Sequence, residues 1–270
     1  MGTVQSADGT TIAFETWGEG SRPLIMVDGA TAHRAVSQLN AAVGELLGDA
    51  FRLYAYDRRG RGESGDTPPY RVEREVEDLA ALIEDAGEPA LVCGLSSGAV
   101  LALDAAAAGL PIGGLALFEP PFVVDDSRPP VPADYVRRLD ESTAAGRPGD
   151  AVELFLTGAV GIPAEHVAGM RQSAYWPGLE AVAGTIAYDG RIMGSTMSGG
   201  PLPADRWAGV TAPAVVLHGR DTAPWLITAA RALAELLPSA SLRPVEGANH
   251  DVAADVLAPV LREFAHASVR

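Results

Sequence analysis

Short apolar runs alternate with longer amphipathic stretches along most of the chain, and this order limits the folds that it can adopt. The runs lie at 24–27, 53–56, 90–93, 115–118, 214–217 and 241–245. Between them, apolar residues recur at helical spacing, most clearly in 72–85, and a hairpin around Asp8-Gly9 is predicted to open the chain. We therefore predict an α/β fold, with a doubly wound, mostly parallel sheet covered by helices on both faces.

The alternation stops after the sixth predicted strand, 115–118, which is closed by Pro120-Pro121. The next stretch is helical and punctuated by prolines, with helix starts predicted near Pro132, Gly149 and Pro163. This break predicts a segment inserted between two strands of the sheet. We expect residues 1–121 to form the first part of an α/β core, 122–205 a helical cap, and 206–270 the second part of the core.

Composition excludes several classes of function. The chain of 270 residues is 47% hydrophobic, enough for a large core, and its net charge of −15 would repel nucleic acid. All 20 basic residues are arginine, so Schiff-base chemistry and a phosphate-loop lysine are excluded. Cys93 is the only cysteine, which excludes an intrachain disulfide and a zinc site with four thiolate ligands. No apolar run approaches the roughly 20 residues that span a bilayer.

These features predict a cytoplasmic protein without a membrane partner, and the bias towards arginine and alanine indicates a GC-rich, bacterial source. The sequence leaves the oligomeric state open, a homodimer included.

One turn between a predicted strand and a predicted helix carries a candidate nucleophile. Gly94-Leu95-Ser96-Ser97-Gly98 follows the apolar run 90–93 and precedes an alanine-rich stretch, 99–108. In a G-x-S-x-G elbow the small residues allow a strained turn that lifts the serine hydroxyl out of the sheet. Chance can supply these five residues in a chain with 30 glycines, whereas the strand-to-helix context is much rarer. We therefore interpret Ser96 as the nucleophile.

A nucleophilic serine needs a base and an acid that orients the base, and in this architecture they follow the serine in the order acid, then histidine. His250 lies in the loop between the last predicted strand and the last helix, which makes it the best of the five histidines as the base. Asp221 follows the preceding strand and is the favoured acid. Glu119, at the end of the strand before the cap, is the alternative acid.

Four motifs in order give the chain a resemblance to the α/β-hydrolase fold superfamily over nearly its whole length. They are the segment Asp57 to Ser64, which looks like the D-x-R-G-x-G-x-S loop of these enzymes, the Ser96 elbow, the turn Gly219 to Asp221, and the loop Gly247 to His250. Within the superfamily the elbow helix, Phe118 to Pro121 and the long helical insertion are similar to those of small bacterial serine hydrolases with a cap.

The resemblance implies further site residues. The oxyanion hole would consist of the backbone N–H groups of Ala30 and Ser97, beside Gly29. Specificity would come from the cap, and the candidate substrate-binding residues there are Tyr135, Trp176, Tyr188 and Met193.

The chain departs from the family pattern at two positions. Asp28 stands where the family commonly has histidine before the glycine of the oxyanion turn, which places a carboxyl group near the hole. Asp221 comes one residue sooner after Gly219 than is common, with Thr222 at the usual position of the acid. The second departure is the reason that Glu119 stays a candidate.

The expected reaction is acyl transfer through Ser96, followed by attack of water, on a hydrophobic ester, lactone or thioester, and it requires neither a metal nor an organic cofactor. The expected partner is a small hydrophobic substrate. Two alternatives remain: a cofactor-free enzyme of the same fold that does not hydrolyse, such as an oxygenase, perhydrolase or lyase, and a ligand-binding protein with a vestigial triad.

Overall fold

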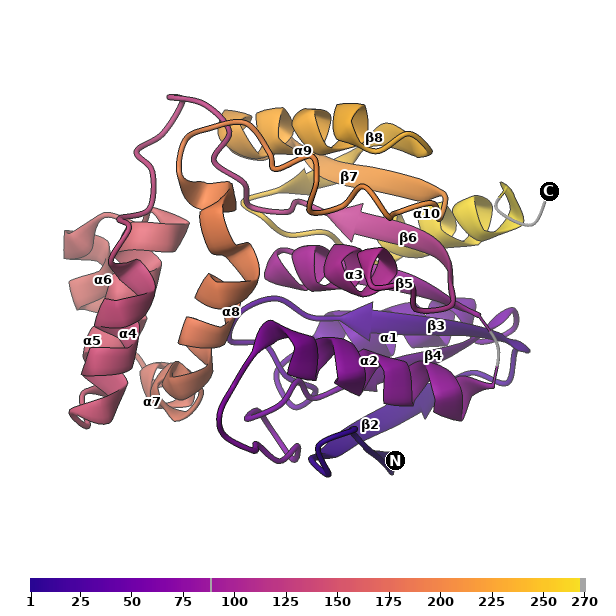
Figure 1. Cartoon of the computed structure of the whole chain (residues 1–270), viewed down its shortest axis with the longest axis horizontal. Coiled ribbons are helices and arrows are strands. Elements are labelled where there is room, and N and C mark those ends of the chain that lie inside the picture. The colour runs from indigo at the N-terminus through magenta and orange to yellow at the C-terminus, as the bar shows by residue number, and fades with distance from the viewer. Residues whose placement is uncertain (88, 268–270) are drawn as a thin grey trace.

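The computed structural model describes residues 1–87 and 89–267, and these form one eight-stranded sheet with helices on both faces (Figure 1). The strands are β1 (Gly2–Gln5), β2 (Thr11–Trp17), β3 (Arg22–Val27), β4 (Phe51–Tyr56), β5 (Ala90–Leu95), β6 (Ile112–Phe118), β7 (Ala214–Asp221) and β8 (Ala240–Ala248). Their order in the sheet is β1-β2-β4-β3-β5-β6-β7-β8. Only the pairs β1–β2 and β2–β4 are antiparallel. The predicted fold class is confirmed.

Five helices cover the two faces of the sheet. They are α1 (Gln38–Leu47), α2 (Val72–Ala86), α3 (Ser97–Ala107), α9 (Pro224–Leu236) and α10 (Ala254–Ala267). Alternate residues of a strand face opposite sides, so Ile25 and Val27 pack in one core with α2, α3 and α9, while Leu24 and Met26 pack in the other with α1 and α10. This burial on both faces is why the central strands appear in the sequence as continuous apolar runs.

The helical segment between β6 and β7 lies within residues 122–205, the predicted cap region, and we use the name cap for this segment. It contains α4 (Tyr135–Ala144), α5 (Pro148–Leu154), a π-helical segment (Phe155–Val160), α6 (Ala164–Met170), α7 (Trp176–Ala181) and α8 (Ile186–Met193), with 3₁₀ turns at Ala183–Thr185 and Gly194–Met197. In Figure 1, α8 stands between the helices α4 to α6 and the core. The positions of α4, α5 and α6 agree with the predicted helix starts, whereas no start was predicted for α7 or α8.

Within the part of the chain that the structure describes, no helix has the length and apolar character needed to cross a membrane. The carboxyl ends of the parallel strands β3, β5, β6 and β7 meet at one edge of the sheet, where the loops that follow them carry the candidate site.

Candidate active site

Ser96 lies at the turn between β5 and α3 in a backbone conformation that non-glycine residues rarely adopt, with φ 56° and ψ −125°. The neighbouring glycines make this turn possible. A Cβ at Gly98 would lie 2.1 Å from the carbonyl oxygen of Val27, and a Cβ at Gly94 would lie 2.5 Å from Cα of Ala99. The strand, turn and helix predicted around Ser96 are therefore present, and the glycines are required by close backbone packing.

His250 follows β8, and its ring lies against a buried carboxylate. The distance between His250 Nδ1 and Glu119 Oε2 is 2.6 Å, and the second oxygen of Glu119 accepts a hydrogen bond of 2.8 Å from the N–H of Gly219. Glu119 is fully buried, while the His250 side chain is 36% exposed and lines a cavity together with Ser96. The pair therefore presents a histidine to the cavity with a carboxylate fixed behind it.

The carboxylate that contacts His250 is thus Glu119, the alternative acid, and the preference for Asp221 was wrong in this respect. Asp221 is the last residue of β7 and is exposed at the cavity, whereas the next residue, Thr222, is buried. Successive side chains of a strand point to opposite faces, so a shift of one residue turns the carboxylate of Asp221 away from His250. Glu119 reaches the histidine from the adjacent strand β6 instead.

The turn after β3 comes close to Ser96, as an oxyanion hole would require. A Cβ at Gly29 would lie 2.9 Å from Cβ and 3.5 Å from Oγ of Ser96, so only glycine allows this approach. Ala30 and Ser97 both line the cavity. Ser97 is the first residue of α3, and the N–H groups of the first turn of a helix have no partner within the helix. The residues that carry the predicted donors therefore line the same cavity as Ser96.

Asp28 also lines the cavity, next to this turn. Its buried carboxylate accepts a hydrogen bond of 2.9 Å from Nδ2 of Asn40, a residue of α1. Burial raises the pKa of Asp28, while the bond from Asn40 and the charges of Arg61 and Arg58 oppose the shift. The positive charges of Arg61 and Arg58 act on this carboxyl group, and they lessen the repulsion that Asp28 would exert on a developing oxyanion.

The cavity at this edge of the sheet has a volume of about 1050 Å³, and residues of both the core and the cap line it. Of the predicted substrate-binding residues, Gly29, Tyr135 and Met193 line it. Other large apolar side chains in its wall include Phe155, Val160, Met197, Trp225 and Leu226. Phe155 and Val160 belong to the π-helical segment, an irregularity that often occurs at functional sites.

Two predicted substrate-binding residues do not line the cavity. Trp176 is buried inside the cap, with the guanidinium of Arg171 over its ring. Tyr188 stacks on Tyr70, with 3.7 Å between ring centroids, and its hydroxyl donates a hydrogen bond of 2.6 Å to Asp66. Trp176 therefore contributes to the core of the cap and Tyr188 to the contact between cap and core.

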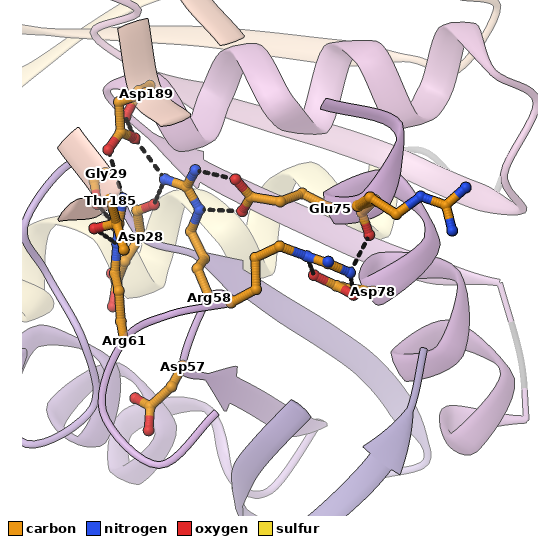
Figure 2. Close-up of polar contacts among 12 residues, drawn as sticks. Asp28, Gly29, Asp57, Arg58, Arg61, Glu75, Asp78, Thr185 and Asp189 are labelled. Carbon is orange, nitrogen blue, oxygen red and sulfur yellow. Dashed lines mark hydrogen bonds and ion pairs between the residues drawn. The ribbon is translucent and has the colours of Figure 1, made fainter. Parts of the chain in front are cut away.

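A buried network of charges, which the sequence did not predict, includes Asp189 in the cavity wall (Figure 2). Arg58 forms two hydrogen bonds with Glu75, of 2.7 and 2.8 Å, and a third of 2.7 Å with Asp189 of α8. Arg61 donates to the other oxygen of Asp189 and to Thr185. The signal in the sequence was the cluster of arginines at 58–61, which the motif comparison above covers only as part of the D-x-R-G-x-G-x-S loop.

The loop in which these arginines lie is held by its own motif residues. Asp57 accepts hydrogen bonds from the N–H groups of Arg34, at 2.8 Å, and Glu63, at 2.9 Å. Arg59 is fully buried and forms two hydrogen bonds with Asp78, of 2.8 and 2.7 Å. The motif therefore makes a rigid loop, from which Arg58 and Arg61 extend towards the cavity and the cap.

Comparisons with known proteins agree with this architecture. A model of the alpha/beta hydrolase family matches residues 25–262. Among solved structures, an alpha/beta hydrolase from Sphaerobacter thermophilus DSM 20745 is 51% identical, with a TM-score of 0.88 over 97% of this chain and 99% of that one. An enol-lactonase from Burkholderia xenovorans LB400 shares the fold at 20% identity, with a TM-score of 0.70 over 98% and 100% of the two chains.

An esterase from Exiguobacterium antarcticum also shares the fold, at 19% identity and a TM-score of 0.70 over the whole length of both chains. No curated protein matches this sequence significantly.

Proposed function

Because this chain belongs to the alpha/beta hydrolase family, we propose that it is a serine hydrolase that cleaves a carboxylic ester, lactone or thioester of a hydrophobic small molecule. The observation that carries the proposal is the hydrogen bond between Glu119 and His250, at the cavity that Ser96 also lines. A carboxylate on Nδ1 keeps the proton of the neutral ring on that nitrogen and leaves Nε2 free to act as a base.

In the proposed mechanism His250 removes the proton of Ser96 as Oγ attacks the carbonyl carbon. The N–H groups of Ala30 and Ser97 stabilise the oxyanion of the tetrahedral intermediate. His250 then gives its proton to the leaving oxygen or sulfur, which yields an acyl-enzyme. Water attacks the acyl group in the second step, with His250 again taking the proton, and Ser96 is regenerated when the acid leaves.

Two observations support the substrate class. The cavity wall is mostly apolar, and it includes Tyr135, Phe155, Met193 and Met197 from the cap and Trp225 and Leu226 from α9. Such walls favour hydrophobic acyl or alcohol groups. The second support comes from the solved structures that share this fold, since they include an enol-lactonase and an esterase, both of which act on carboxylic ester bonds.

The test is turnover of p-nitrophenyl esters of graded chain length, together with labelling by a fluorophosphonate probe. We expect turnover and labelling at Ser96, and both should be lost in Ser96→Ala. Labelling without turnover of any ester would favour a non-hydrolytic enzyme of the same fold. A wild-type protein that is neither labelled nor active, and yet is stabilised by hydrophobic ligands, would show a binding protein with a vestigial triad.

A further inference from the structure

The buried arginines hold the peptide groups of the oxyanion turn. Arg61 Nη1 donates a hydrogen bond of 2.7 Å to the carbonyl of Gly29, and Arg58 Nη1 donates one of 3.3 Å to the carbonyl of Asp28. The C=O of Gly29 and the N–H of Ala30 belong to one planar trans peptide, in which they point in opposite directions. A guanidinium that fixes this carbonyl therefore also fixes the direction of the Ala30 N–H.

One carboxylate of the cap contacts both these arginines and the residue that carries the second proposed oxyanion donor. Asp189 of α8 accepts hydrogen bonds from Arg58 and Arg61, and it accepts a further one of 2.7 Å from the hydroxyl of Ser97. Ser97 carries the second proposed oxyanion donor on its backbone. Asp189 thus contacts the residues that position both donors, although it lies more than 90 residues from Ser97 in the sequence.

The network leaves the Arg61 guanidinium little freedom. Its Nε donates to the Thr185 hydroxyl at 3.0 Å, Nη1 to Gly29, and Nη2 to Asp189, so each of its nitrogens has a partner (Figure 2). The side chains of Arg58 and Arg61 are each 1% exposed, and that of Asp189 is 6% exposed. In so buried a place an arginine without its counterion would be strongly unfavourable, and its neighbours would have to rearrange.

We propose that Asp189 is a positioning residue that sets the oxyanion hole from the cap, because it holds Arg61 on the Gly29 carbonyl and Ser97 at the start of α3. This inference rests on the proposed hydrolase function. It gives the cap a role in the chemical step in addition to the shape of the cavity, and it assigns that role to α8 among the cap helices.

A second attachment holds α8 independently of Asp189. Arg206 donates to the carbonyls of Met193 and Ile192, at the end of the helix, and forms two hydrogen bonds with Asp104 of α3. Loss of the Asp189 carboxylate therefore leaves the end of α8 attached to the core. A change in activity can then be assigned to the oxyanion turn.

The chain offers a matched control for Asp189→Asn in Asp78→Asn. Asp78 is also buried and also accepts two hydrogen bonds from an arginine of the same loop, Arg59, but none of the contacts of this pair reaches the oxyanion turn. Both variants replace a buried carboxylate by an amide of the same shape, and both remove a negatively charged partner of a buried arginine. They should both lower the melting temperature, so stability alone cannot separate them.

The readout is inhibition by an alkylboronic acid, whose boron is attacked by Ser96 Oγ while the proton passes to His250. The tetrahedral adduct places a boron-bound oxygen in the oxyanion hole. We expect Asp189→Asn to raise the inhibition constant about tenfold and to lower kcat about tenfold. Complete loss of one oxyanion donor lowers kcat by about 10²–10³-fold, and a misplaced donor should cause only part of that loss. KM for a p-nitrophenyl ester should stay within about threefold, since ground-state binding does not use the hole.

Asp78→Asn should leave the inhibition constant and kcat at the wild-type values. Equal effects of the two variants on the inhibition constant and kcat would overturn the proposal. If Asp189→Asn does not fold, Ser97→Ala decides the question, since it removes one bond to Asp189 without a change of charge and keeps the N–H. It should slow labelling by the fluorophosphonate about threefold, the worth of one ordinary hydrogen bond, and an unchanged rate would refute the role. A wild-type protein that is not labelled at all would instead contradict the proposed function.

Discussion

The two hydrogen bonds of the Glu119 carboxylate lead to a quantitative prediction for Glu119→Gln. One oxygen accepts from the N–H of Gly219 at 2.8 Å, and the other lies 2.6 Å from Nδ1 of His250. Glutamine has a single acceptor oxygen, and the Gly219 N–H can only donate, so the oxygen of the amide should stay on Gly219. The NH₂ group then faces His250.

This arrangement reverses the tautomer of the His250 ring. Nδ1 must accept a hydrogen bond from the amide, so the neutral ring carries its proton on Nε2 and can no longer take the proton of Ser96. In the serine-protease template the same wrong tautomer lowers kcat by about 10⁴, which corresponds to about 5 kcal/mol in the activation barrier. We expect a loss of this size in Glu119→Gln, with a smaller change in KM.

The assay compares initial rates on p-nitrophenyl butyrate for the wild type, Glu119→Gln and Asp221→Asn. Asp221 is the matched control, because it is a carboxylate at the same cavity that is exposed and lies on the adjacent strand. Asp221→Asn should retain activity within about twofold, in line with other surface substitutions. Circular dichroism and a thermal melt should accompany the rates, since Glu119 is fully buried. Retention of more than a tenth of the activity by Glu119→Gln, with a large loss in Asp221→Asn, would refute this reasoning.

Three further predictions concern the turn, the elbow and the cavity. Burial raises the pKa of Asp28, so folding favours its neutral form, and the stability of the protein falls as pH rises from about 4 through the raised pKa. Asp28→Asn should remove this part of the pH dependence of Tm. A pH profile of Tm that is the same in the variant and the wild type would contradict the prediction. Gly98→Ala places a Cβ 2.1 Å from a backbone oxygen and should cost about 1–3 kcal/mol and reduce labelling, whereas Gly169→Ala, with nothing within 4 Å, should cost nothing in a urea titration. The cavity wall carries four aspartates and no arginine among its described residues, so a p-nitrophenyl hemiester of a dicarboxylic acid should show about tenfold lower kcat/KM than a neutral ester of equal length, with the gap narrowing as salt is added.

The parts of the fold that the sequence predicted correctly depend on local patterns. The central strands are buried on both faces, so they appear as apolar runs whatever their partners in the sheet are. The Ser96 elbow was found because its strand, turn and helix are contiguous. The loop of His250 followed from the order of elements, since the histidine comes between the last strand and the last helix.

The errors arose where the outcome depends on the direction of a side chain or on a distant partner. A single residue of register decides whether the buried side chain is at position 221 or at 222, and spacing in the sequence does not fix it. Trp176 and Tyr188 are aromatic residues of the cap, like Tyr135, but a helical pattern does not distinguish the cavity from other buried surfaces. Arg58 meets Asp189 across 131 residues, a contact that no local pattern contains.

Backbone strain supports Glu119 as the acid independently of its hydrogen bonds. In the described part of the chain, the non-glycine residues with positive φ are Thr31, Ser96, Glu119, Asn249 and His250. Such conformations cost of order 1–3 kcal/mol each and persist where the surroundings impose them, commonly at functional sites. All five are at the oxyanion turn, the elbow, the end of β6 or the histidine loop, and Asp221 is not among them. Glu119 has φ 44° directly before the two prolines that lead into the cap. The backbone conformation of the residue that contacts His250 therefore also sets the direction in which the cap begins.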